Sequence, residues 1–196
     1  MSHSEQEEYW NERYIAGETG WDLGMASPPI AEYADQLGDK SIDILIPGCG
    51  SAYEAKYLLE LGFSSITLID ISEFACQRLR SELLPEFDGK VKVIQGDFFE
   101  FNGQFDLIIE QTFFCALPVD LRQAYMEKMY VLLKPRGKLV GLLFDRQFEL
   151  SPPFGGSKEE YRKLFEQKFK ICTLEACTNS VKPRENSELF CILKKQ

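Results

Sequence analysis

The sequence predicts an α/β fold in which a mostly parallel sheet is built from strands that alternate with helices. Short apolar runs of strand length recur along the chain, separated by segments with apolar residues at helical spacing. The first run, within residues 41–46, ends in a glycine turn at residues 47–50 (PGCG) that leads into a helical segment. Near the C-terminus, two apolar runs flank a polar turn, which indicates an antiparallel hairpin.

The glycine turn and the acid after the next strand predict a nucleoside-binding site. The second apolar run, residues 66–69, is followed directly by Asp70, 22 positions after Gly48. Glycines let a ligand approach the backbone closely, and an acid at the tip of the next strand can bind both hydroxyls of a ribose. The alternative is a strand-to-helix connection with a purely structural role.

The residues after the turn favour S-adenosylmethionine over NAD. A dinucleotide site uses a third glycine, in the pattern GxGxxG, for close helix packing beside a pyrophosphate. Tyr53 stands at that third position, and Glu54 adds negative charge to the first turn of the helix. A diphosphate would be repelled there, whereas the cationic amino-acid tail of S-adenosylmethionine would not.

The composition predicts a single domain that works on small molecules. The 196 residues are 44% hydrophobic, and the net charge of -9 disfavours partners such as nucleic acid or an anionic membrane. No apolar segment reaches the roughly 20 residues that cross a bilayer. Because the N-terminus is also polar rather than signal-like, we expect a cytoplasmic protein, and we expect it to be a monomer.

The cysteines and the single histidine limit the chemistry. Six cysteines are scattered without a C-x-x-C pair, so neither disulfides nor structural zinc is expected. The only histidine is His3, close to the N-terminus, which argues against a histidine-based triad or a histidine-rich metal site. Any general base must be Asp, Glu, Tyr or Cys, or the reaction needs none.

The N-terminal segment, residues 1–38, is predicted to form a helical and aromatic lid. Residues 4–16 predict a helix with Ser4 as the N-cap of a capping box, and residues 17–29 a loop around Trp21. A second helix starts at the two prolines and runs through residue 37. One face of the first helix carries Tyr9, Trp10, Arg13 and Tyr14. This face either packs on the domain or covers a ligand.

The third strand is predicted to position an adenine site. A helix capped at residues 71–73 runs through Leu84, and residues 91–95 form a strand that ends at residues 96–99 (GDFF). Asp97 can bind an adenine amino group there while Phe98 stacks on the base. The alternative is that Asp97 only caps a turn.

The fourth strand, residues 105–110, leads directly into an apolar segment at residues 111–117 (QTFFCAL). Ligands of open parallel sheets sit beyond the carboxyl ends of the strands, so this segment should line the reaction pocket. A helix at residues 118–133, a turn at residues 134–137 and a fifth strand at residues 138–144 are predicted to follow.

The last quarter contains a loop at residues 151–156 (SPPFGG) that is long enough to fold over a pocket. Residues 157–160 cap a short helix, and strands at residues 169–176 and 189–194 form the hairpin across the polar turn at residues 179–185. The chain contains no internal repeat and no sign of a second domain.

With these elements placed, the chain resembles the class I S-adenosylmethionine-dependent methyltransferases, and more narrowly the thiopurine S-methyltransferase family with its thiol and halide methyltransferase branch. The resemblance runs from about Trp10 to the C-terminus. Its motifs lie at residues 10–14 (WNERY), 19–22 (TGWD), 47–50 (PGCG), 70–72 (DIS), 105–108 (FDLI), 112–117 (TFFCAL) and 152–154 (PPF). It implies a Rossmann-like, seven-stranded, mostly parallel sheet with helices on both faces.

The resemblance also implies individual roles. The aromatic residues of the lid would close over the cofactor, Gly48 would approach its methionine part, Asp70 would hold the ribose, and residues 97–98 would bind adenine. The implied cofactor set is Trp10, Tyr14, Trp21, Gly48, Cys49, Gly50, Asp70, Ile71, Asp97, Phe98 and Gln111.

Three positions depart from the family pattern. Tyr14 stands where many relatives have Trp, and Gln111 where the thiol and halide branch has Tyr. Ala52 replaces a glycine of that branch but matches the thiopurine branch, so the choice of branch stays open. Arg122 matches a position near the substrate in the thiopurine branch, with a solvated helix arginine as the alternative.

The predicted activity is methyl transfer to a small soft nucleophile. A sulfonium already carries the electrophile, so a thiol, thiopurine, thiocyanate or halide needs alignment and a dry pocket more than a base. The substrate-pocket candidates are Phe113, Phe114, Arg122 and Phe154, and no metal is expected. The alternatives are an O- or N-methyltransferase with a carboxylate base, a non-catalytic S-adenosylmethionine-binding protein, and an NAD-dependent oxidoreductase, which Tyr53 disfavours.

Overall fold

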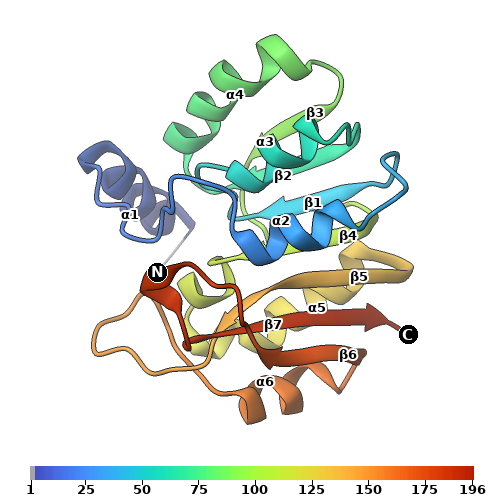
Figure 1. The fold of residues 1–196 in the computed structure, drawn as a ribbon. Helices are drawn as coiled ribbons and strands as arrows, with labels where there is room; N and C mark the ends of the chain where they lie inside the picture. The colour runs from blue at the N-terminus through green and yellow to red at the C-terminus, as the bar shows by residue number, and fades with distance from the viewer. Residues whose placement is uncertain (1–2) are drawn as a thin grey trace.

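A computed structural model describes residues 3–196 and shows seven strands in one mixed sheet, in the order β3-β2-β1-β4-β5-β7-β6 (Figure 1). The neighbouring strands β3 (Val91–Gln95), β2 (Ile66–Asp70), β1 (Ile44–Pro47), β4 (Phe105–Gln111) and β5 (Leu133–Phe144) pair in parallel. β7 (Glu188–Lys195) runs antiparallel to both β5 and β6 (Phe169–Ala176). The predicted fold class and the C-terminal hairpin are therefore confirmed.

Helices cover both faces of the sheet. α2 (Pro28–Asp35), α3 (Tyr53–Glu60) and α4 (Glu73–Phe87) share one hydrophobic cluster with the strands, and α5 (Arg122–Leu132) and α6 (Lys158–Phe165) share the other. Within β1, Ile44 and Ile46 join the α3 side and Leu45 the α5 side, because successive residues of a strand point to opposite faces. A strand covered on both faces must be apolar throughout, which explains the continuous hydrophobic runs in the sequence.

α1 (His3–Ala16) packs beside α4, and the loop after α1 crosses the end of the sheet where the parallel strands finish (Figure 1). Because the described helix already includes His3, Ser4 lies inside it, and the capping box predicted at Ser4 is wrong. Nothing in the sequence near Ser4 separates a first-turn serine from a capping serine, since both favour helix starts.

Two other helix boundaries differ from the prediction. α2 ends at Asp35, two residues before Leu37. α4 continues past Leu84 to Phe87, although Pro85 lies in its last turn. Phe87 is buried in the core, so hydrophobic burial outweighs the local cost of the proline.

The segment predicted as helix, turn and strand at residues 118–144 is also arranged differently. A 3-10 turn (Val119–Leu121) precedes α5, and the turn predicted at residues 134–137 lies inside β5. There Phe105 pairs with Leu133 while Leu107 pairs with Lys138, so the strand bulges without leaving the sheet.

The C-terminal quarter follows the prediction more closely. Ser157 caps α6 with a complete capping box in which its side chain accepts the Glu160 N–H and the Glu160 carboxylate accepts the Ser157 N–H. A 3-10 turn (Lys182–Arg184) lies in the connection between β6 and β7. The six cysteines are free thiols, and in the described chain no helix is long and apolar enough to cross a membrane.

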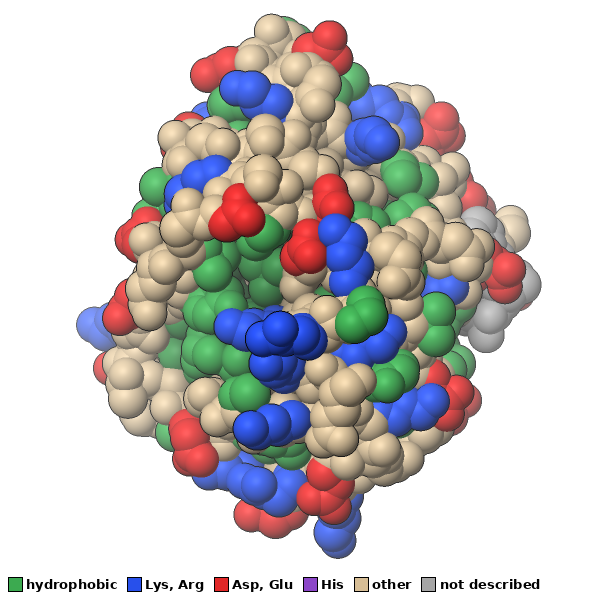
Figure 2. All heavy atoms as spheres, turned by 90° about the vertical axis from the view of Figure 1, so that its right-hand side faces the viewer, with side chains coloured by type: hydrophobic (Ala, Val, Ile, Leu, Met, Phe, Trp, Pro, Cys, Tyr) green, Lys and Arg blue, Asp and Glu red, His purple; other side chains and the backbone are tan. Residues whose placement is uncertain are grey.

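The face on the right-hand side of Figure 1, where the parallel strands begin, is shown in Figure 2. Basic and acidic side chains are intermixed across it. At this edge the Lys134 Nζ lies 2.6 Å from Asp43 Oδ2 and 2.7 Å from Asp106 Oδ2, which ties β5 to the starts of β1 and β4. The Lys134 ammonium group is therefore paired with both carboxylates at this edge.

Candidate functional site

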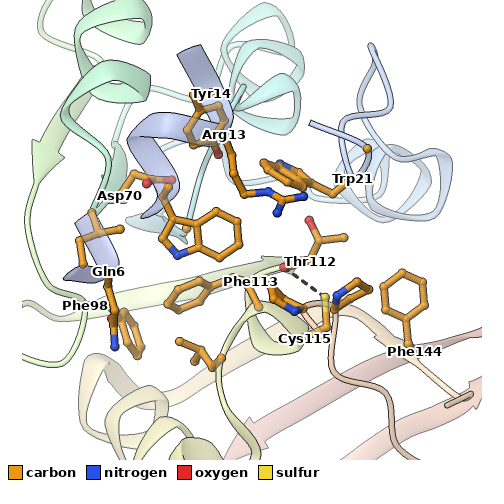
Figure 3. Close-up of a pocket in the computed structure, with 18 of the residues that line it drawn as sticks. Gln6, Arg13, Tyr14, Trp21, Asp70, Phe98, Thr112, Phe113, Cys115 and Phe144 are labelled. Atoms are coloured by element: carbon orange, nitrogen blue, oxygen red, sulfur yellow. Dashed lines mark hydrogen bonds between the residues drawn. The ribbon is translucent and has the colours of Figure 1, made fainter. Parts of the chain in front are cut away.

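A cavity of about 460 Å³ opens at the carboxyl ends of the parallel strands (Figure 3). Its wall comes from α1, the loop after α1, the segments that follow β1, β2, β3, β4 and β5, and the connection between β6 and β7. Figure 3 shows Asp70 and Phe98 toward one side, Cys115 and Phe144 toward the other, and Phe113 between them.

The two sides of the cavity carry opposite charges. We call the side with Asp70 and Asp97 the acidic end, since these are the carboxylates among the described lining residues. We call the other side the arginine end, and its members are Arg13, Phe144, Arg146, Phe148 and Arg184.

Asp70, at the last position of β2, is held by backbone amides. Its Oδ2 accepts the Gly50 N–H and its Oδ1 accepts the Ser72 N–H, both at 2.9 Å. The residue is only 6% exposed, and burial raises the pKa of its carboxyl group while the amide donors oppose that rise. One acid therefore links the glycine turn to the start of α4.

The glycine turn requires the backbone freedom of glycine. Gly48 and Gly50 have φ of +55° and +52°, a region that costs other residues about 1–2 kcal/mol. A Cβ at Gly48 would lie 2.2 Å from the Phe113 ring, and one at Gly50 would lie 2.8 Å from the Tyr14 hydroxyl. The turn thus allows two aromatic side chains to approach the backbone.

Aromatic side chains from α1 and the following loop form the upper wall. Trp21 makes edge-to-face contacts with Trp10 and Tyr14, with ring centroids 5.4 and 5.7 Å apart. Arg13 lies with its Cζ 5.6 Å from the Trp21 ring and points into the cavity beneath it (Figure 3). Burial beside Asp70 raises the pKa of Tyr14, so its hydroxyl stays protonated.

A side-chain latch holds α1 in this position. The Asn11 Oδ1 accepts the Ser72 hydroxyl at 2.7 Å and the Phe74 N–H at 3.2 Å, at the N-terminus of α4. Ser72 also caps α4 through the Ala75 N–H. Because Ser72 additionally donates its own N–H to Asp70, the lid helix and the buried acid share one anchoring residue.

The predicted adenine residues lie at the acidic end. Asp97 follows β3 and accepts the Phe99 N–H at 2.7 Å, so the turn-capping alternative also describes it. Phe98 lines the cavity and packs edge-on against Phe113, with centroids 5.1 Å apart. The Asp97 carboxylate and the Phe98 ring thus border the space that an adenine ring would need.

Glu110 shapes the turn that carries Phe113. Its Oε1 accepts the N–H groups of Phe113 and Phe114 at 2.8 and 2.9 Å, and its Oε2 accepts the Tyr125 hydroxyl at 2.5 Å. Burial raises the pKa of Glu110 to about 7, against the opposing effect of these donors. Sequence reasoning treated this residue only as the end of a strand.

A smaller cavity of about 50 Å³ adjoins the first beneath Trp21. Its lining includes Cys49, Gly50 and Gln111. The buried Oε1 of Gln111 has no hydrogen-bond partner among the described residues. Glu54, the first-turn acid, is buried beside it and accepts the Ser27 N–H at 2.9 Å. Its charge therefore faces the loop after α1 rather than solvent.

The structure brings most of the predicted cofactor residues together. Eight line the larger cavity, namely Trp10, Tyr14, Trp21, Gly48, Asp70, Ile71, Asp97 and Phe98, and three line the smaller one, namely Cys49, Gly50 and Gln111. Both sets surround the glycine turn because all of these segments end at one edge of the sheet.

Of the predicted substrate-pocket residues, only Phe113 lines the cavity. Phe114 points into the core against Tyr125 and is 2% exposed. Arg122 lies over the Phe114 ring and donates to the Phe154 and Gly155 carbonyls at 3.4 and 2.6 Å. None of these three residues, Phe114, Arg122 and Phe154, lines the cavity as predicted: Phe114 belongs to the core, and Arg122 holds the loop after β5 through the Phe154 and Gly155 carbonyls.

The arginine end was missed by sequence reasoning. Arg184 is buried, its Nη1 lies 3.3 Å from Glu188 Oε1, and its Nη2 donates to the Trp21 carbonyl at 2.6 Å. Arg146 is exposed just after β5, a position from which the open-sheet rule could have suggested it. Arg184 carried no such signal, since it lies in a polar turn between two strands.

The chain matches the family described as Thiopurine S-methyltransferase over residues 5–194. A probable thiol methyltransferase 2 from Arabidopsis thaliana is 33% identical over 159 residues, covering 79% of this chain and 70% of the relative. A thiopurine S-methyltransferase from Acinetobacter baylyi is 26% identical, covering 87% and 88% of the two chains.

The fold is also shared with a solved structure. A 1,6-didemethyltoxoflavin-N1-methyltransferase from Burkholderia thailandensis, with bound 1,6-didemethyltoxoflavin and S-adenosylhomocysteine, superposes with a TM-score of 0.79 at 17% identity. The superposition covers 97% of this chain and 87% of the other. At that identity the likeness establishes the fold alone.

Proposed function

The chain belongs to the thiopurine S-methyltransferase family, and on that premise we propose that it methylates the sulfur of a small thiol. Membership makes it an S-adenosylmethionine-dependent methyltransferase. The observation that carries the choice of acceptor is the cavity itself. It joins the acidic end to the arginine end, where the described lining residues include aromatic side chains but no carboxylate and no histidine.

The acidic end suits the adenosine part of the cofactor. Asp70 would hold the ribose hydroxyls, because its oxygens still have acceptor capacity beyond the two amides that they already bind. Asp97 and Phe98 would bind the adenine, and Trp10, Tyr14 and Trp21 would close over the nucleoside. The unused lone pairs of the buried carboxylate support this assignment.

The smaller cavity suits the cationic amino-acid tail. The unpartnered Gln111 Oε1 offers an acceptor there, and the Asp22 and Glu54 side chains add negative charge along the same wall. A pyrophosphate would be repelled by these acids, so the arrangement favours a sulfonium cofactor over a dinucleotide.

When bound, S-adenosylmethionine supplies an electrophilic methyl group: the acceptor sulfur pair forms the new bond while the carbon–sulfonium pair stays on the cofactor sulfur. The protein aligns the two partners and excludes water, and Phe113 and the lid aromatics form the apolar wall. Cys115 lines the cavity, but burial raises the pKa of its thiol and keeps it from serving as a base. The acceptor should therefore arrive as an anion.

A radiolabelled methyl-transfer assay tests the proposal. Purified protein and S-adenosylmethionine carrying a tritiated methyl group are incubated with thiophenol, 6-mercaptopurine, thiocyanate and iodide, and with catechol and aniline as oxygen and nitrogen acceptors. We expect transfer to the thiols, with weaker transfer to the small anions. Transfer to catechol or aniline alone would contradict the proposal, as would no transfer despite bound S-adenosylhomocysteine in calorimetry.

A matched pair of variants ties the activity to the cavity. Asp70→Asn replaces one acceptor oxygen by a donor that faces a backbone N–H, so we expect cofactor affinity to fall by about 10- to 100-fold. Asp88→Asn, on an exposed aspartate beyond the end of α4, should leave affinity unchanged.

The cytoplasmic location and the monomeric state remain predictions. Six free cysteines fit a reducing compartment. Fractionation of the source cells and light scattering of the purified protein would test the two predictions separately.

A further inference from the structure

We infer that Arg78, which lines neither cavity, is a positioning residue that holds the loop after α1 over the bound cofactor and slows the release of that cofactor. It acts through a hydroxyl bridge, the name we give to the side chains of Asp22, Ser51 and Arg78. The inference rests on the proposed function, in which the cofactor occupies the two adjoining cavities, and adds to it the group that keeps them closed.

The hydroxyl bridge joins three segments that are far apart in the sequence. Arg78 Nη2, on α4, donates to the Ser51 hydroxyl at 2.8 Å, and that hydroxyl donates to Asp22 Oδ2 at 2.5 Å. Ser51 directly follows the glycine turn, and Asp22 belongs to the loop after α1. Because the serine oxygen accepts from a cation while its proton is donated to a carboxylate, both hydrogen bonds are charge-assisted and stronger than bonds between neutral groups.

The bridge fixes the turn that carries Trp21. Asp22 Oδ1 accepts the Gly24 N–H at 2.8 Å, so both carboxylate oxygens of Asp22 are engaged. The Asp22 N–H donates to the Thr19 carbonyl at 2.8 Å, which closes a tight turn with Trp21 inside it. Anchoring Asp22 to Ser51 therefore also anchors the tryptophan ring.

Trp21 lies where the two cavities meet. Together with Gly48 and Thr112, it lines both the larger and the smaller cavity. Figure 3 shows Trp21 and Tyr14 above the larger cavity and Phe113 below them. In the proposed function the larger cavity holds the adenosine and the smaller one the amino-acid tail, so the cofactor extends beneath this ring. Movement of the loop would uncover both parts of the cofactor at once.

Arg78 also contacts the lid helix directly. Its Cζ lies 5.9 Å from the centroid of the Tyr14 ring, and Tyr14 packs edge-on against Trp21 at 5.7 Å. By contrast, the ion pair of Arg78 with Glu82 on the same helix is long, with 3.9 Å between Nε and Oε1, and it lies on the surface, where such pairs contribute little. The contacts toward the lid therefore hold the guanidinium group in place.

A different route from Arg78 to the cofactor would run through charge alone. Burial raises the pKa of the Asp70 carboxyl, and the positive charge of Arg78 is among the influences that oppose that rise. Ser51→Ala separates the two routes, because it breaks the hydroxyl bridge and leaves the charge of Arg78 in place.

Stopped-flow fluorescence tests the inference, because the two tryptophans of the chain are Trp10 and Trp21. Both line the larger cavity, so the intrinsic emission reports on the lid. Each protein is mixed with a series of S-adenosylhomocysteine concentrations, and the release rate is the intercept of the observed rate against concentration. The proteins are the wild type, Arg78→Met, Ser51→Ala, their double variant, and the matched control Glu82→Gln, which removes only the surface partner of Arg78.

We expect release to be about 5- to 10-fold faster in Arg78→Met and in Ser51→Ala, while Glu82→Gln matches the wild type. The emission of the unliganded Arg78→Met and Ser51→Ala variants should shift to longer wavelength, because Trp21 becomes more exposed to water. The double variant should release the cofactor no faster than the faster single variant, because both changes break the same bridge.

An unchanged release rate in Arg78→Met would overturn the inference. So would effects that multiply in the double variant, since they would show that Arg78 acts on the cofactor independently of Ser51. If Arg78→Met fails to fold, Ser51→Ala decides alone, and a wild-type release rate in that variant would overturn the inference.

Steady-state kinetics separate this role from a general loosening of the fold. In the methyl-transfer assay, Arg78→Met should raise the KM for S-adenosylmethionine about 5- to 10-fold and leave the acceptor KM within about 2-fold. A rise of equal size in the acceptor KM would contradict a positioning role at the cofactor. Because the fluorescence measurement needs no acceptor, it decides the inference even if no thiol is methylated, in which case only the proposed function fails.

Discussion

The two ends of the cavity are held in place in different ways. At the acidic end, Asp70 is fixed by the backbone amides of Ser72, two positions after it, and Gly50, 20 positions before it in the preceding turn. At the arginine end, Arg184 is fixed by a side chain of its own hairpin and by the carbonyl of Trp21, 163 positions away. A local backbone motif can specify the first end, whereas the second exists only once the whole chain has folded.

This difference has a functional meaning. The acidic end is built from strand tips and from a turn whose geometry depends on Gly48 and Gly50. The arginine end depends on side chains from α1, the segment after β5 and the connection before β7. Its side chains can therefore change without disturbing the acidic end. Specificity for the acceptor is therefore expected to reside in the arginine end.

The largest expected effect comes from removing the buried ion pair between Arg184 and Glu188 at the arginine end. Arg184→Met leaves Glu188, which is 4% exposed, without its partner, and we expect about 3–5 kcal/mol lower stability in urea unfolding. The double variant Arg184→Met with Glu188→Leu should recover part of the loss, since no buried charge remains. Arg162→Met, on an exposed helix position, is the control. A loss of stability below about 1 kcal/mol for Arg184→Met would show that the Arg184–Glu188 ion pair does not hold this end in place.

The next effect tests the glycine turn between the two ends. Gly48→Ala forces a positive φ on alanine and places a Cβ against the Phe113 ring, so we expect a loss of about 3 kcal/mol and weaker S-adenosylhomocysteine binding. Gly38→Ala is the matched control, because Gly38 has no positive φ and open space around it. Equal stability of the two variants would show that the turn relaxes freely.

A third test concerns Glu110, which supports the wall between the ends. Folding raises its pKa from 4.5 to about 7, so in that interval the native state holds a proton that the unfolded chain has released. The contribution of Glu110 to the free energy of unfolding therefore falls as pH rises from about 4.5 to 7, by up to about 3 kcal/mol.

Glu110→Gln removes the titrating group, so the difference in unfolding free energy between wild type and variant should shift by that amount between pH 4.5 and 7.5. Glu100→Gln, which changes an exposed glutamate, should leave the pH profile unchanged. A constant difference across this range would show that Glu110 does not titrate there.

The smallest expected effect concerns the latch at the acidic end. Asn11→Ala removes the acceptor for the Ser72 hydroxyl and the Phe74 N–H, and we expect about 1 kcal/mol, or about 5-fold weaker S-adenosylhomocysteine binding by calorimetry. Glu12→Ala, an exposed neighbour on α1, should bind normally. Unchanged affinity in Asn11→Ala would show that α1 closes without this latch.

The amino-acid sequence alone predicts the mostly parallel sheet, its C-terminal hairpin, and the glycine turn and Asp70 at the acidic end. These features depend on local patterns: apolar runs between turn residues, and an acid directly after a strand. The bulge inside β5 was missed because residues 134–137 have turn chemistry, and only the pairing of Leu133 and Lys138 with β4, on either side of them, keeps the strand in the sheet.

The direction of each side chain in the segment 111–117, and the set of arginines that share the cavity, depend on how the elements pack together. Phe113 and Phe114 are chemically identical neighbours whose N–H groups both donate to Glu110 Oε1, yet Phe113 lines the cavity and Phe114 lies in the core. Arg13, Arg146 and Arg184 are far apart in the chain, and no periodicity links them. Their grouping follows from α1, the segment after β5 and the connection before β7 meeting at one edge of the sheet, which is a property of the packed fold.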